Sequence, residues 1–122
     1  MKNSIVADKS FNFSLRIINC YKFLCEEKRD FILSKQLLRC GTSIGANIAE
    51  ALGAQSSKDF IAKLSISFKE SIETEYWIRL LQASNYLDDK SSSSLLNDCI
   101  EIRKIISSIL ITSKKKTFAP HS

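Results

Sequence analysis

Glycine and proline are too scarce in this chain to supply the turns that most folds need. Among 122 residues there are three glycines and one proline, and the proline stands at position 120. An all-β domain needs turn residues about every 8–12 positions, so such a fold is nearly excluded. Three glycines are also too few for a glycine-rich phosphate-binding loop. A chain of this length can still bury a core without disulfides or metals. The sequence therefore predicts one all-α domain.

Apolar residues recur at spacings of three and four in four segments, which is the period of an amphipathic helix. We expect helices over about residues 8–27, 30–52, 57–84 and 91–114, with 117–122 as a disordered tail. Short connections between such helices favour an antiparallel up-down-up-down four-helix bundle.

Each segment has one stripe that we expect to face the core. The third segment also carries apolar residues beside its stripe, including Ile72 and Tyr76, so it is expected to contact neighbours on two sides. The predicted core stripes are Phe11, Leu15, Ile18, Tyr21 and Leu24 or Cys25 in the first segment; Phe31, Leu37, Cys40, Gly41, Ile44, Ile48, Ala51 and Leu52 in the second; Phe60, Leu64, Ser67, Ser71, Thr74, Ile78 and Leu81 in the third; and Leu95, Cys99, Ile102, Ile106, Ile109 and Ser113 in the fourth.

Two of the three glycines, Gly41 and Gly45, stand four residues apart inside the second segment. Each glycine inside a helix costs about 1 kcal/mol relative to alanine, so its presence there needs a compensating reason. We expect close approach of a neighbouring helix, and a loop over 41–45 is the alternative. Gly53 and Asn85 are expected to end the second and third helices in the left-handed conformation.

Polar residues mark the starts of the last two helices. Ser56 or Ser57 is expected to cap the third helix. The serine run 91–94 directly precedes an apolar stripe, which favours a capped helix start over a flexible linker.

Histidine and cysteine set narrow limits on catalysis and metal binding. The single histidine is His121, whereas Ser–His–Asp and Cys–His mechanisms need a positioned imidazole. Cys20, Cys25, Cys40 and Cys99 form no C-x-x-C pair, so we interpret them as reduced thiols, with disulfides as the alternative. The sequence predicts no enzymatic activity, no metal and no cofactor. Without a signal-peptide core or a membrane span, it also predicts a cytoplasmic protein.

A run of small residues between charges resembles the signature of a known family. Residues 39–51, RCGTSIGANIAEA, are similar to the segment R-x-x-x-S-I-x-x-N-I-A-E-G of the four helix bundle proteins, also called the 23S rRNA intervening-sequence or S23 family. Residues 73–75 resemble that family's E-L-E-T run, and residues 85–87 resemble its G-Y-L run. The chain departs from the pattern at Ala51 and Asn85, where the family usually has glycine. Its counterparts of the motif residues are Arg39, Ser43, Asn47, Glu50, Glu73 and Glu75.

The resemblance implies a left-handed antiparallel bundle, a ring-like homopentamer and a bacterial protein without established enzymatic activity. Some family members are encoded inside insertions in 23S rRNA genes. The resemblance also implies a relation to accessory proteins of diversity-generating retroelements, which bind nucleic acid and a reverse transcriptase through a basic surface. The partners it implies are further copies of this chain, RNA or DNA, and a reverse transcriptase or another protein.

Charges inside the apolar second and third segments predict an ion pair. A charge facing a core is costly unless it is paired, so Arg39 is expected to pair with Glu73 or Glu75. The alternative is that these charges face water. Glu73 and Glu75 stand two positions apart and point to different helix faces, which disfavours a general acid–base pair. Asn47 is expected to cap a helix or to cross-link through its amide.

The charge balance permits nucleic-acid binding without requiring it. Eighteen basic against thirteen acidic side chains give a net charge of +5, which a ring would multiply. No sequence-reading motif is present, and solvated helix faces are the alternative role for the lysines. The candidate phosphate contacts are Lys35, Arg39, Lys58, Lys63, Lys69, Lys114, Lys115 and Lys116.

An oligomeric structural or protein-interaction module is the alternative function. Tyr76 and Trp77 are its candidate anchors, because aromatic side chains are enriched at interface hot spots. The alternative is that both belong to the core.

Overall fold

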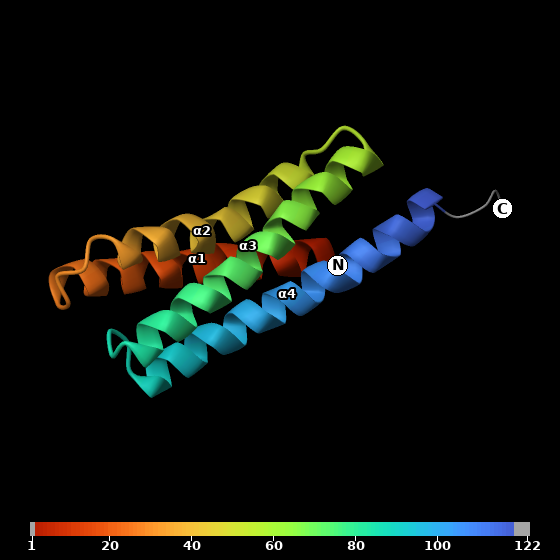
Figure 1. The fold of residues 1–122 in the computed structure, drawn as a ribbon. Helices are drawn as coiled ribbons and strands as arrows, with labels where there is room; N and C mark the ends of the chain where they lie inside the picture. Colours follow the sequence, from red (N-terminus) through yellow and green to blue (C-terminus); the bar gives the residue numbers. More distant parts are fainter. Residues whose placement is uncertain (1, 119–122) are drawn as a thin grey trace.

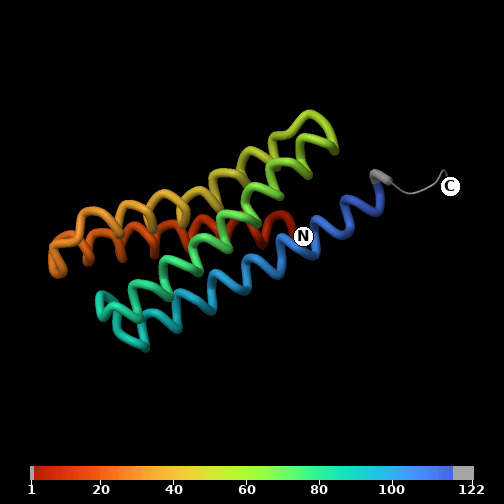
Figure 2. Tube along the Cα trace, viewed as in Figure 1, coloured from red at the N-terminus to blue at the C-terminus, as the bar shows by residue number. Residues whose placement is uncertain are grey.

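The computed structural model describes residues 2–118 as four helices packed side by side in antiparallel order (Figure 1). They are α1 (Lys2–Glu26), α2 (Leu33–Leu52), α3 (Ser57–Ala83) and α4 (Asp89–Phe118). Each helix packs on the next, and α4 packs back on α1. The turns that follow α1 and α3 lie at one end of the bundle and the α2–α3 turn at the other (Figure 2). The predicted all-α up-down-up-down bundle is confirmed, and the described residues contain no strand.

The helix boundaries differ from the predicted ones at both termini. The first helix begins at Lys2 instead of residue 8, because buried Val6 extends its apolar contacts. The last helix begins at Asp89, where the Asp88 carboxylate accepts a 2.7 Å hydrogen bond from the Ser91 backbone N–H. It continues to Phe118, so residues 117–118 are helical, and the rest of the expected tail lies outside the described residues. The expected cap of α3 is confirmed, since the Ser56 hydroxyl accepts from the Asp59 N–H at 3.1 Å.

The predicted core stripe of α1 is wrong over most of its length. Phe11 is 66% exposed and Leu15 is 47% exposed. The residues that face the core instead are Val6, Ser10, Phe13, Ile17 and Leu24, of which only Leu24 was expected. Both sets have the spacing of an amphipathic helix, and only the packing against α2 and α4 decides between them.

The other three helices bury nearly all of their predicted stripes. Phe31 and Leu52 are exposed, since Phe31 precedes α2 and Leu52 ends it, and Phe60 and Ser113 are only half-buried. The confirmed core residues are Leu37, Cys40, Gly41, Ile44, Ile48 and Ala51 of α2; Leu64, Ser67, Ser71, Thr74, Ile78 and Leu81 of α3; and Leu95, Cys99, Ile102, Ile106 and Ile109 of α4.

The two glycines inside α2 lie where α1 comes closest. A Cβ atom on Gly41 would stand 2.8 Å from Cγ1 of Ile17, and one on Gly45 would stand 3.2 Å from the Ser10 carbonyl oxygen. Close helix approach is therefore confirmed, and the alternative of a loop over 41–45 is wrong. 

The ends of α2 and α3 differ from each other. Gly53 ends α2 with φ −96°, so the predicted left-handed conformation is wrong there. Its N–H bonds to the Glu50 carbonyl oxygen at 3.2 Å within a tight last turn that needs no positive φ. Asn85 does adopt φ 67° after α3, as predicted.

Candidate nucleic-acid interface

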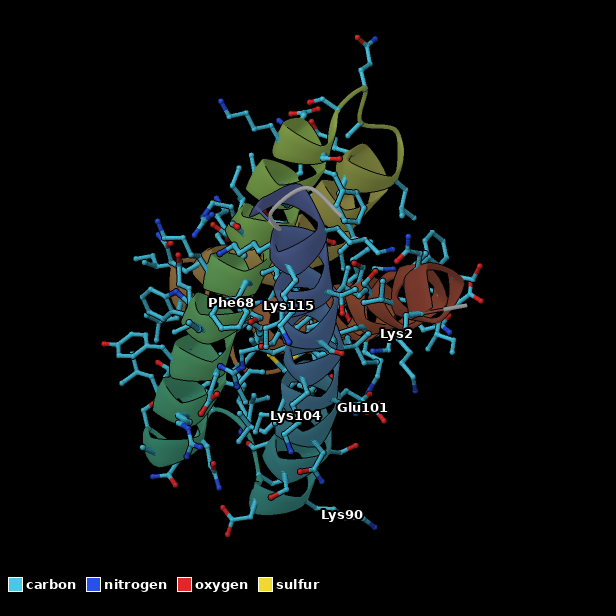
Figure 3. All side chains as sticks on the ribbon, turned by 90° about the vertical axis from the view of Figure 1, so that its right-hand side faces the viewer. Lys2, Phe68, Lys90, Glu101, Lys104 and Lys115 are labelled. Carbon is cyan, nitrogen blue, oxygen red and sulfur yellow. The ribbon has the colours of Figure 1, made fainter. Side chains whose placement is uncertain are left out.

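The predicted phosphate contacts do not form a single patch. Lys58 is in the first turn of α3 and residues 114–116 are in the last turns of α4, which lie at the same end of the bundle (Figure 1). Lys35 is in the first turn of α2, at the opposite end, and Lys69 is near the middle of α3. Four of the eight candidates therefore lie at one end of the bundle, and Figure 3 labels one of them, Lys115 on α4.

Two of the eight cations already have carboxylate partners inside the molecule. Lys63 pairs with Glu50 at 3.4 Å, which joins α3 to α2. Arg39 pairs with Glu70 at 3.2 Å and with Glu73 at 2.5 Å. The other six are exposed, and none of them forms an ion pair with a carboxylate among the side chains that the structure describes.

Glu73 is the centre of a hydrogen-bonded group between α2 and α3. Its carboxylate accepts from Arg39 and, at 3.0 Å, from the indole N–H of half-buried Trp77. The Trp77 hydrogen bond and the Arg39 guanidinium hold the pKa of Glu73 below its usual range. The predicted pairing of Arg39 with Glu73 or Glu75 is confirmed for Glu73, and both side chains of the pair also face water in part. Trp77 therefore forms a hydrogen bond within its own bundle, whereas the Tyr76 side chain is 58% exposed.

Glu75 faces the other neighbour of α3. It pairs with Arg103 of α4 and, at 2.8 Å, with Arg79 one turn along α3. These two guanidinium groups, Arg103 first, hold the pKa of Glu75 below its usual range. Glu73 and Glu75 therefore point to different faces, as predicted, and each fixes α3 against a different helix.

These lowered pKa values predict a loss of stability in acid. The stabilisation from a carboxylate with a depressed folded-state pKa is complete above the unfolded-state value, near 4.3, and is lost as the pH falls through the folded value. We expect the Glu75→Gln variant to lose about 1 kcal/mol at pH 7, because the pair is partly open to water. Its free energy of unfolding should then fall less steeply than that of the native protein between pH 5 and 3. Urea unfolding at several pH values measures both effects.

Glu27→Gln is the matched control for this series, because Glu27 is an exposed carboxylate in the connection after α1. It should leave the pH dependence of stability close to native. An acid slope in Glu75→Gln as steep as the native one would contradict the role assigned to the pair with Arg103.

A polar ladder that the sequence analysis missed joins α1 to α4. The cations of this ladder are seven residues apart on α1, and three of their partners are seven residues apart on α4 in the reverse order. The two helices are therefore antiparallel, and the same spacing is kept along their contact. The matched spacing is the feature of the sequence that could have predicted the ladder. Figure 3 labels two of its members, Lys2 and Glu101. The contacts are Lys2 to Ser108 at 2.6 Å, Lys9 to Glu101 at 3.0 Å, and Arg16 to Asp98 at 2.6 Å and to the Ser94 hydroxyl at 2.9 Å.

The remaining signature residues have local roles. The Asn47 amide donates to the Ser43 carbonyl oxygen at 2.9 Å and lies 3.0 Å from the Ser43 hydroxyl. The cross-link predicted for Asn47 therefore lies within α2 and does not join two helices. Glu50 pairs with Lys63 and so joins α2 to α3. These signature residues therefore stabilise α2 and its contact with α3.

Three of the four cysteines lack the environment of reactive thiols. All four are free, and burial raises the pKa of Cys20 and Cys40 to about 11 and that of Cys99 to about 12. Buried thiols with raised pKa values stay protonated near neutral pH and are poor nucleophiles. Within the described residues, no group of three His, Cys, Asp or Glu side chains could hold a metal ion. His121 lies outside the described residues.

The model of the family described as 23S rRNA-intervening sequence protein matches residues 2–108. The chain belongs to this family. It is similar to the crystal structure of a protein of unknown function from the S23 ribosomal protein family of Bacteroides thetaiotaomicron, with 53% identity and a TM-score of 0.89. The match covers 90% of this chain and 98% of that one. No curated protein matched the chain.

Membership of the 23S rRNA-intervening sequence protein family confirms the resemblance drawn from residues 39–51, 73–75 and 85–87. The relation to retroelement accessory proteins stays a prediction. Within residues 2–118, the helices are too short or too polar to cross a membrane.

Proposed function

We propose that this protein is a non-enzymatic, homo-oligomeric bundle that binds RNA or DNA through electrostatic contacts with the phosphate backbone. One observation carries the proposal: Lys58 and residues 114–116 lie exposed at one end of the bundle without ion-pair partners among the described side chains. The free thiols suit the reducing bacterial cytoplasm in which we place it.

Binding of this kind depends on the number of phosphates that are neutralised. Each chain carries a net charge of +5, and copies held together in an oligomer present several lysine clusters to one nucleic acid. Arg39 and Lys63 contribute less than the sequence suggested, because carboxylates neutralise them. We expect recognition of the backbone instead of the base sequence, and the family's name makes structured RNA the first ligand to test.

A protein-interaction module is the second candidate function. The observation that favours it is the exposure of large apolar side chains on the outside of α3, including Ile72 and Tyr76. Such a surface suits a protein partner, either another copy of this chain or a different protein such as a reverse transcriptase.

The lysine cluster on α4 gives a direct test. We expect the triple variant Lys114→Gln, Lys115→Gln and Lys116→Gln to bind labelled duplex RNA and duplex DNA more weakly, by a similar factor for every sequence. The slope of log affinity against log salt should shrink by about 0.9 for each phosphate contact that is lost, up to roughly 3 per chain. Filter binding between 50 and 200 mM salt measures this slope.

The control removes the same charge elsewhere. Lys22→Gln, Lys28→Gln and Lys90→Gln change three exposed lysines near the opposite end of the bundle. This variant should bind nearly as tightly as the native protein. Equal losses in both variants would show that net charge, and not the α4 cluster, governs binding. If micromolar native protein binds neither RNA nor DNA in a salt-sensitive way, the nucleic-acid function is wrong.

A further inference from the structure

The polar ladder that joins α1 to α4 leads to a pocket at one end of the bundle. Its contacts connect residues 2, 9 and 16 of α1 with residues 108, 101 and 94 of α4. One further step of seven residues along the ladder reaches Phe23 on α1 and Leu87 just before α4. Both side chains are apolar, so they cannot continue the ladder. They instead line a pocket between the second half of α1 and the beginning of α4.

The size and the apolar lining of this pocket suit a small molecule. Its volume is about 520 Å³, within the roughly 300–1,000 Å³ that is usual for ligand sites. Cys20, Leu87 and Leu95 supply apolar surface. Phe23 also lines the pocket and is 42% exposed, so part of its aromatic ring is open to a ligand. A flat ring in the ligand can stack on it.

Two cations line the same pocket. Lys90, which Figure 3 labels, is exposed in the first turn of α4. Its ammonium group forms no ion pair with a carboxylate among the described side chains. Arg16 is held in the pocket wall, because its guanidinium pairs with Asp98 at 2.6 Å and donates to the Ser94 hydroxyl at 2.9 Å. The charge of Arg16 is thereby partly balanced, whereas the charge of Lys90 is available to an anionic group of a ligand.

Groups that can hydrogen-bond to a neutral part of a ligand also line the pocket. Asp88 accepts a 2.7 Å hydrogen bond from the Ser91 backbone N–H, and that bond holds the pKa of Asp88 below its usual range. The carboxylate is therefore ionised at neutral pH and repels an anion beside it, but it can accept from a ligand hydroxyl. The Asn19 amide and the Ser91 hydroxyl can donate or accept. The pocket thus combines an aromatic surface, an available cation and partners for hydroxyl groups.

A nucleotide has the matching parts, namely a flat base, a sugar with hydroxyl groups and a phosphate. We propose that the pocket binds one nucleotide, whose base stacks on Phe23 and whose phosphate pairs with Lys90. Inorganic phosphate alone would leave the aromatic surface uncovered, and a hydrocarbon would leave the cation and the hydrogen-bonding groups without partners. Stacking on an aromatic side chain accepts every base. We therefore expect little dependence on which base the nucleotide carries.

The pocket is separate from Lys58 and residues 114–116, which lie at the opposite end of the bundle (Figure 1). The inference therefore does not rest on the binding of duplexes by that lysine cluster. A fully paired duplex keeps its bases stacked inside the helix, so it offers no base to Phe23. A nucleotide can reach the pocket as a free molecule or as an unpaired nucleotide of RNA, whose base can turn outward. Both sources present the same chemistry to the pocket. 

Removal of the aromatic ring tests the stacking. We expect the native protein to bind labelled adenosine monophosphate saturably in equilibrium dialysis, and the Phe23→Ala variant to bind it at least about fivefold more weakly. Phe31→Ala is the matched control, because Phe31 is 51% exposed just before α2, at the same end of the bundle, but does not line the pocket. It should leave the dissociation constant unchanged. Both rings are exposed, so circular dichroism should show native helix content in both variants.

Comparison of the nucleotide with its nucleoside tests the cation. Lys90→Gln should weaken the binding of adenosine monophosphate by about fivefold, because a charge-assisted contact with the phosphate is lost. The same variant should bind adenosine as the native protein does. Lys28→Gln changes an exposed lysine in the connection after α1 and should affect neither ligand. Because only the ligand with a phosphate should respond to Lys90→Gln, this readout distinguishes a lost contact from a general disturbance of the pocket.

A bulged RNA distinguishes the two sources of the nucleotide. An RNA hairpin with one unpaired adenosine and the same hairpin without it are compared by fluorescence anisotropy. If RNA supplies the nucleotide, the bulged hairpin should bind at least about fivefold more tightly, and Phe23→Ala should remove that difference. If the free nucleotide is the ligand, the two hairpins should bind equally, and adenosine monophosphate should still depend on Phe23 and Lys90.

The outcomes also separate this site from the proposed function. The inference is overturned if the native protein shows no saturable binding at about 1 mM adenosine monophosphate. Equal losses in Phe23→Ala and Phe31→Ala, or equal weakening of nucleotide and nucleoside in Lys90→Gln, overturn it as well. The triple variant of residues 114–116 should bind adenosine monophosphate as the native protein does. A native protein that binds this nucleotide as expected, but binds no duplex in a salt-sensitive way, contradicts only the function proposed for the lysine cluster.

Discussion

Phe13→Ala should destabilise the bundle by about 3–5 kcal/mol, whereas Phe11→Ala should change its stability by less than about 1 kcal/mol. Phe13 is 1% exposed within the core and Phe11 is 66% exposed on the outside of the same helix. Removing the ring at position 13 loses its transfer free energy and leaves a cavity that the neighbouring helices cannot close fully. Urea unfolding followed by circular dichroism gives both free energies.

These measurements are best made at low protein concentration, where self-association would not add to the stability of the fold. Equal losses of unfolding free energy for the two alanine variants would contradict the orientation of α1.

The error over α1 shows what helical spacing can and cannot predict. Residues 11, 15 and 18 have the same period as the residues that are buried, and both sets are rich in large apolar side chains. An exposed apolar stripe and a stripe that faces the core give the same periodic signal in one sequence. In α2 the choice was clear, because small residues and charges occupy the other positions.

Ion pairs were predictable only where the sequence limited the number of partners. Arg39 is a charge in an apolar-rich stretch of α2, and the acidic residues of α3 were few enough to name Glu73 or Glu75 as its partner in advance, of which Glu73 is the one that pairs. Arg103 was missed as the partner of Glu75, because the register of α4 against α3 depends on how the whole core packs. For the same reason the sequence could list the cations but could not show that Lys63 is neutralised by Glu50.

Gly41→Val should destabilise the bundle by about 3 kcal/mol, although valine is a better helix former than glycine. Three atoms of the Ile17 side chain would lie 2.8–2.9 Å from the new Cβ, and the valine methyl groups add further volume. Because Ile17 is fully buried, moving its side chain away from the new Cβ would push it against other core side chains. Urea unfolding of the Gly41→Val variant measures the loss.

Two further variants show whether contact with Ile17 is the cause. Gly53→Ala should be neutral within about 0.5 kcal/mol, because its Cβ would meet nothing closer than 3.8 Å and the backbone has a φ of −96° that alanine adopts. Adding Ile17→Ala to Gly41→Val should cost at least about 1 kcal/mol less than the sum of the two single losses, since the valine then fills the space that isoleucine leaves. Additive losses would mean that Gly41 is required for some other reason. Non-additive losses would show that α2 has a glycine at position 41 so that α1 and α2 can pack at close range.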